Sequence, residues 1–164
     1  MHPLFHPLFI EFCTYFNGNQ DYFECHEALE EYWKEIAPGE REHPLVGYVQ
    51  LATGLYHWRR DNRKGATRIL QKAVRLFEKH AASPFFDYVQ YDELLAQTKL
   101  AATQAEHAPF QPFLLPICNE QLHMRTAEAI AKLPVLDAQF ILHKHKLRDR
   151  SHIIAEREAN RRAR

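Results

Sequence analysis

The spacing of apolar residues is the feature that most constrains how this chain of 164 residues can fold. In one segment after another, apolar side chains recur at intervals of three, four and seven residues, the period of a helix with one buried face. Strand-like alternation is absent from the sequence, only five glycines occur, and the turn signals fall between the periodic segments. We therefore predict an all-α fold, namely a compact antiparallel helical bundle with a C-terminal helical extension.

Turn-forming residues divide the chain into its expected helices. We predict helices over residues 3–16, 21–37, 44–60, 62–80, 92–107, 119–132 and 137–164. Prolines at 109, 112 and 116 indicate a rigid connector, which places a boundary between a bundle of residues 1–108 and a segment of residues 109–164. That segment, the connector with basic C-terminal helices, should pack on the bundle or on a partner. Gly47 and Gly54 lie on one side of the third helix, so a neighbouring helix can approach closely there.

Residues 21–33 combine five acidic side chains, one histidine and four aromatic residues in less than four helical turns. On a helix, His26, Glu30 and Trp33 share one face, and Glu27 lies on the adjoining face. His26, Glu27 and Glu30 can therefore offer two or three coordinating atoms to a divalent metal, which needs three or four. The same side chains could instead bind a small ligand. The H-E-x-x-H motif of zinc peptidases and the paired E-x-x-H elements of di-iron bundles are both absent.

His57 is the best candidate for a ligand from another helix. If the second and third helices form an antiparallel hairpin about residue 40, His26 lies opposite Gly54 and about one turn from His57. We expect the close approach at Gly54 to leave room for the imidazole of His26. The alternative is a buried hydrogen-bonded network without function, because buried carboxylates persist when they are paired. The supporting residues of either arrangement are Trp33, Gln50, Tyr56, Arg59 and Arg68.

Basic residues of the fourth helix predict a second kind of site. Whole-chain charge decides little, because the formal net charge is zero. Six residues spaced by three or four form a cationic ridge, consisting of Arg60, Lys64, Arg68, Lys72, Arg75 and Lys79. With the basic tail of residues 143–164, the ridge suggests phosphate or nucleic-acid binding. A solvated face partly paired with the acidic second helix explains the same charges, and no exposed aromatic residues accompany the tail, so nucleic acid is not the favoured partner.

The last predicted helix suggests a third function, that of an oligomeric scaffold without chemistry. Its sparse apolar residues Phe140, Leu147 and Ile154 repeat by sevens, a pattern that predicts self-association into a homo-oligomer. Three widely spaced cysteines without a C-x-x-C pair predict reduced thiols and a cytoplasmic protein. No segment approaches eighteen apolar residues, so we expect no membrane partner. The sequence leaves open whether the protein is an enzyme.

The motif of residues 22–33 and several later residues resemble a known family. The later residues are Gly47, Gln50, Leu51, Ala52, Leu55, Tyr56, His57, Asn62, Gly65 and Ala66. In order and spacing they are similar to the signature of domain-of-unknown-function family 309, and the resemblance covers roughly residues 12–79. It implies a compact helical bundle in which the element around His26 faces the helix that carries Gln50. It implies no established activity.

Overall fold

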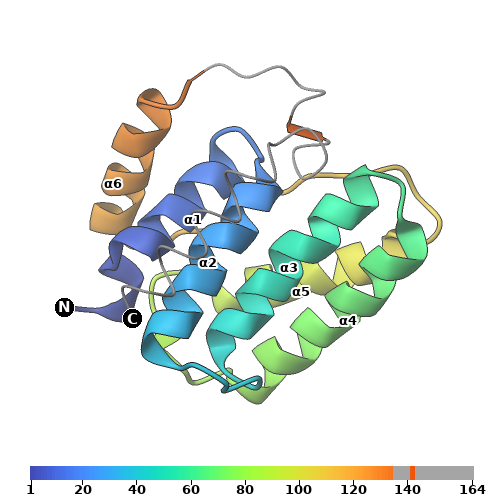
Figure 1. Cartoon of the computed structure of the whole chain (residues 1–164), viewed down its shortest axis with the longest axis horizontal. Helices are drawn as coiled ribbons and strands as arrows, with labels where there is room; N and C mark the ends of the chain where they lie inside the picture. Colours follow the sequence, from blue (N-terminus) through green and yellow to red (C-terminus); the bar gives the residue numbers. More distant parts are fainter. Residues whose placement is uncertain (135–140, 143–164) are drawn as a thin grey trace, which may run out of the picture.

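The computed structural model describes residues 1–134 and 141–142, and over these residues it is an all-α bundle, which confirms the predicted fold class. Its α-helices are α1 (Pro7–Asn17), α2 (Tyr22–Ile36), α3 (Pro44–Arg59), α4 (Arg63–Lys79), α5 (Tyr91–Gln104) and α6 (Glu120–Ala131). Two 3₁₀ helices, η1 (Pro3–Phe5) and η2 (Pro84–Phe86), precede α1 and α5. Each of α1 to α4 packs on the next, α5 packs on α4, and α6 packs on α1 (Figure 1).

The first predicted helix is divided at its second proline. Residues Pro3–Phe5 form η1, His6 has an extended backbone, and α1 begins at Pro7. Pro7 has no amide hydrogen and would clash with the preceding turn inside a continuous helix, but it fits the first position of a new one. The Nδ1 atom of His6 caps this new helix by accepting from the amide of Leu8 at 3.1 Å.

The buried face of α2 is centred differently from the predicted one. The apolar spacing of residues 21–37 predicts a core face of Tyr22, Phe23, Leu29, Trp33 and Ile36. Tyr22 and Leu29 do face the core, whereas Phe23 and Trp33 are only partly buried. Ile36 is 45% exposed, so its assignment to the core is wrong. Small residues and a second tyrosine complete the core face instead: Cys25, Ala28 and Tyr32. This rotation turns His26, Glu30 and Trp33 toward the edge of the bundle, where solvent reaches them.

The glycines of α3 permit the close helix contact that the sequence predicts, and the neighbour is α4. A Cβ atom at Gly54 would lie 2.5 Å from Cγ of Leu70, and one at Gly47 would lie 2.9 Å from the ring of Phe77. Both distances are shorter than van der Waals contact, so only glycine fits without a shift of the neighbouring side chain. Gly54 therefore faces α4, and the expectation that it makes room for His26 of α2 is wrong.

The turn between α2 and α3, residues 37–43, is held on both sides. Trp33 Nε1 donates to the carbonyl oxygen of Glu40 at 2.9 Å. On the other side, Arg75 of α4 donates to both carboxylate oxygens of Glu42 at 3.1 and 2.8 Å, and this pairing lowers the pKa of Glu42 to about 2. The ring of His80 also bonds with the Glu42 carbonyl. The turn is thus fixed to α2 at one residue and to α4 two residues later.

Residues 109–134, which belong to the predicted C-terminal segment, pack on the bundle. Leu115 is buried, and its amide and carbonyl both bond to the side chain of Asn17, at 2.8 and 3.3 Å. Gly18 ends α1 with φ −84°, so it does not take the left-handed conformation; a Cβ atom there would lie 2.9 Å from Ile130 and Leu133. The division of the chain at residue 108 stays a prediction. The predicted stripe of Phe140, Leu147 and Ile154 and the basic tail of residues 143–164 lie outside the described residues.

Among the residues that the structure describes, no helix is both long enough and apolar enough to cross a bilayer. Cys13 and Cys25 are buried free thiols, and Cys118 is an exposed one.

Candidate metal and ligand site

The helical period of α2 brings His26, Glu27 and Glu30 together. Nε2 of His26 lies 3.1 Å from Oε2 of Glu30, one turn later, and Nδ1 of His26 lies 3.4 Å from Oε1 of Glu27. One ligand atom from each of the three residues falls within 4.8 Å of the others. All three side chains are about 30% exposed. An ion from solvent can therefore reach a group that is already assembled on one element.

The two candidate ligand atoms that lie closest together, His26 Nε2 and Glu30 Oε2, have the separation that a metal requires. Zinc and similar ions bind imidazole nitrogen and carboxylate oxygen at about 2.0 to 2.2 Å, so adjacent ligands lie roughly 3 to 3.5 Å apart. The 3.1 Å between His26 Nε2 and Glu30 Oε2 falls in that range. Glu27, on the Nδ1 side of the ring, stands where a carboxylate commonly orients a metal-bound histidine by accepting its other N–H.

Lys34 neutralises part of the negative charge that Glu27 and Glu30 give to this group. Its Nζ atom lies 2.7 Å from Oε1 of Glu30, and its position one turn beyond Glu30 makes this an i, i+4 pair. Oε1 of Glu30 thus faces the ammonium group while Oε2 faces the imidazole. The pairing of Lys34 with Glu30 was not predicted from the sequence, although the same i, i+4 rule that relates His26 to Glu30 relates Glu30 to Lys34.

His57 of α3, the proposed outside ligand, is not part of the group of three. Burial lowers the pKa of His57, and the charges of Arg60 and His26 lower it further. Nδ1 of His57 lies 3.2 Å from Nδ2 of Asn62, the residue that precedes α4. The amide therefore fixes one ring nitrogen of His57 and leaves Nε2 for another partner.

Other predicted supporting residues point elsewhere. Arg59 donates to the carbonyl of Gln20 at 2.7 Å and stacks on the ring of Tyr22, 4.8 Å from its centre. Arg68 is exposed on α4, and Tyr56 is covered by the guanidinium of Arg60 at 5.2 Å. The buried network proposed around His26 therefore does not draw on Arg59, whose contacts tie α3 to the start of α2 instead.

The cationic ridge, which begins at Arg60 after α3 and continues along α4, is divided between paired and exposed residues. Arg75 and Lys79 both contact Glu42, at 2.8 and 3.5 Å, and Arg60 lies over Tyr56. The exposed members with no ion pair to another described residue are Lys64, Arg68 and Lys72.

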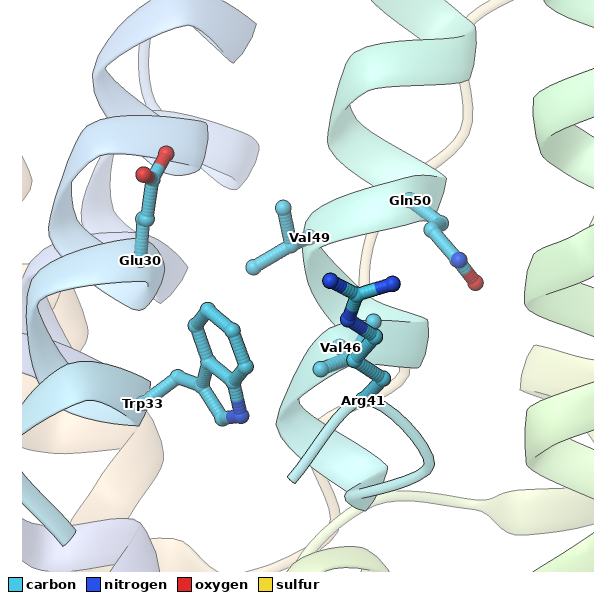
Figure 2. Close-up of a pocket in the computed structure, with 6 residues that line it drawn as sticks. All are labelled: Glu30, Trp33, Arg41, Val46, Val49 and Gln50. Atoms are coloured by element: carbon cyan, nitrogen blue, oxygen red, sulfur yellow. The ribbon is translucent and has the colours of Figure 1, made fainter. Parts of the chain in front are cut away.

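A pocket of about 250 Å³ adjoins the acidic group, because Glu30 belongs to both. It lies between α2 and α3 beside the turn that joins them (Figure 2). Its lining residues are Glu30, Trp33, Arg41, Val46, Val49 and Gln50. Trp33 faces Val46 and Glu30 lies level with Val49 and Gln50, the register expected of an antiparallel hairpin about residue 40 (Figure 2). The sequence offered no signal for Arg41, which comes from the turn.

Comparison with known proteins places the chain among relatives of unassigned activity. A family model described as "Domain of unknown function (DUF309)" matches residues 9–69, which include the motif, the pocket and the first turns of α4. The chain is similar to the uncharacterized protein YpuF of Bacillus subtilis strain 168, with 35% identity over 158 residues that cover 92% of this chain and 91% of that protein. No solved structure gives a significant match.

Proposed function

The chain belongs to the DUF309 family, and from this premise we propose that it binds a divalent transition-metal ion at His26, Glu27 and Glu30. The observation that carries the proposal is the convergence of three ligand atoms within 4.8 Å on a solvent-reachable face of α2. Imidazole together with carboxylate suits ions such as Zn²⁺ and Mn²⁺.

The residues take different roles in this site. Nε2 of His26 and Oε2 of Glu30 are the first two ligands, because their 3.1 Å separation already matches adjacent positions around an ion. Glu27 either adds a carboxylate oxygen or orients the ring through Nδ1. His57 of α3 lies outside the group of three and has its Nδ1 held by Asn62, so it would supply a further nitrogen only after moving toward α2. Solvent or a small ligand fills the remaining positions, as at metal sites that keep an open position.

Titration calorimetry of chelator-treated protein with Zn²⁺ and Mn²⁺ tests the site. We expect one ion per chain for the wild type and loss of binding in His26→Ala and Glu30→Gln. Glu31→Gln is the matched control, because Glu31 is an exposed carboxylate on the same helix outside the group of three. Equal affinity in His26→Ala and the wild type would overturn the proposal.

The same variants separate a metal site from a purely structural network. A network predicts that Glu30→Gln and His26→Ala each cost about 1 to 3 kcal/mol of unfolding free energy, because partners lose their hydrogen bonds. A metal site predicts little loss without metal, and a rise in melting temperature with metal in the wild type only, because the ion binds the folded state. Thermal melts with chelator and with metal measure both effects.

A further inference from the structure

We propose that the pocket between α2 and α3 binds a small organic acid with an apolar body and a hydroxyl or amino group next to its carboxylate. Chemically this class includes apolar 2-hydroxy acids and amino acids. The inference rests on the proposed function in one respect, since Glu30, shared by the pocket and the group of three, would place the occupant beside the metal ion. The pocket itself is argued from residues that do not hold the ion.

The walls of the pocket select the body of the ligand. Trp33 of α2 faces Val46 and Val49 of α3 across it, and the indole ring points into the space between the helices (Figure 2). Trp33 Nε1 is already engaged by the carbonyl of Glu40, so the ring offers its apolar face rather than a donor. A volume of about 250 Å³ lies below that of sites for drug-sized molecules, so the occupant is small.

Arg41 selects the charge of the ligand. It is the only lysine or arginine that lines the pocket, and it forms no ion pair with another residue of the described part of the chain. Its neighbours Glu40 and Glu42 are fixed to α2 and α4, so the backbone that carries Arg41 is held before any ligand arrives. A guanidinium group on a fixed turn favours a carboxylate, which it can bind through two parallel hydrogen bonds.

Gln50 indicates the group beside the carboxylate. It lines the pocket together with Arg41, and its Oε1 atom is buried without a hydrogen-bond partner among the described residues. Oε1 has almost no solvent-exposed surface, so the Gln50 amide must rotate to present it to the pocket; an O–H or N–H next to the carboxylate of a ligand would then satisfy this acceptor. Glu30 lies toward the other end of the pocket in Figure 2, and its carboxylate contacts the ring of His26.

Calorimetric titration with three probes tests the inference, first in protein held with chelator. The probes are 2-hydroxy-4-methylpentanoate, 4-methylpentanoate, which lacks the hydroxyl, and 2-hydroxy-4-methylpentanamide, which lacks the charge. We expect the hydroxy acid to bind best and the amide to bind at least about fivefold more weakly. This factor corresponds to the loss of an exposed charge pair that contributes about 1 kcal/mol. No binding of the hydroxy acid at millimolar concentration would overturn the inference.

Variants assign the binding to the pocket. Arg41→Gln should remove the preference for the acid over the amide, and Gln50→Leu should remove the preference for the hydroxy acid over 4-methylpentanoate. Arg68→Gln, an exposed arginine of α4, is the control and should change neither preference. Since Arg41 is exposed, its substitution leaves the fold intact, and unchanged preferences in Arg41→Gln would overturn the inference.

Metal titration separates this inference from the proposed function. Binding of the hydroxy acid with chelator but no metal binding in calorimetry would refute the metal site and leave the pocket. Metal binding without any probe binding would refute the pocket and leave the metal site. If the protein binds both the metal and the hydroxy acid, metal should strengthen the binding of the hydroxy acid. His26→Ala should then abolish only that increase in affinity.

Discussion

His26 Nε2 and Glu30 Oε2 lie 3.1 Å apart on consecutive turns of α2, so one helix sets the spacing of two ligand atoms without help from tertiary contacts. Such a pair forms whenever α2 forms, because residues four apart stand above one another on a helix. Any protein ligand beyond His26, Glu27 and Glu30 depends on how α3 packs against α2.

Glu27 and Glu30 should differ in their effect on metal affinity. Glu30→Gln removes a direct ligand and should abolish measurable binding, whereas Glu27→Gln should weaken it about 10- to 100-fold if Glu27 orients the His26 ring. Calorimetry with Zn²⁺ on both variants measures the difference. Equal and complete loss in both would instead make Glu27 a ligand.

Removing the ammonium group of Lys34 should strengthen metal binding. Lys34 lies 2.7 Å from Glu30 and competes with an ion for that carboxylate, so Lys34→Met should lower the dissociation constant several-fold, with the largest effect at low salt. Competition titration with a chromogenic chelator measures the change. An unchanged constant would indicate that Lys34 does not share the charge of Glu30 with the ion.

Gly54→Ala should destabilise the fold. The added Cβ atom would lie 2.5 Å from Leu70 Cγ, and overpacking of this kind costs about 1 to 3 kcal/mol of unfolding free energy. Urea denaturation checks the value, with Gln71→Ala, an exposed position on α4, as the control. If Leu70→Val restores part of the loss in the double variant, the contact between the two residues is its cause.

Protonation of His43 should make stability depend on pH below neutrality. Burial lowers the pKa of His43 from 6.5, with a smaller lowering from His80 that opposes the raising by Glu40. The folded state resists the proton that the unfolded chain accepts, so stability is constant above about pH 6.5 and falls as the pH drops from there through the folded pKa. Urea denaturation at several pH values should show a smaller slope for His43→Asn.

Asparagine is the suitable replacement, because Nδ1 of His43 accepts from the amide of Leu45 at 3.1 Å and an asparagine side chain can cap the helix in the same way. An identical slope in the wild type and His43→Asn would assign the pH dependence to other groups.

Any affinity of the bundle for polyanions should reside in the exposed part of the cationic ridge. Exchange of Lys64, Arg68 and Lys72 for glutamate should abolish binding to RNA or heparin at low salt, because these residues have no ion pair within the described chain. Arg75→Gln should chiefly lower stability, since Arg75 binds Glu42. Retention of polyanion binding in the triple variant would contradict this assignment.

The sequence predicted the features that depend on local rules. Helix ends at prolines and glycines, the register of α2 against α3 and the grouping of His26 with Glu30 all follow from periodicity and turn chemistry. What it missed depends on the rotation of helices about their axes: Ile36 is exposed because the buried stripe of α2 runs through Ala28, and Gly54 of α3 faces α4 rather than α2. Apolar residues lie on all sides of α3, so the apolar pattern of this helix could not indicate which neighbouring helix its glycines contact.

The contact of Gly54 with Leu70 has a consequence for the opposite side of α3. Because Gly54 has no side chain, Leu70 of α4 packs directly on the backbone of α3 and constrains how α3 is rotated about its own axis; in that rotation Val46 and Val49 line the pocket with Trp33. Leu70 neither lines the pocket nor belongs to the group of three, yet its substitution would change the width of the pocket by rotating α3. Relatives could change their ligand in this way while every residue that touches it stays the same.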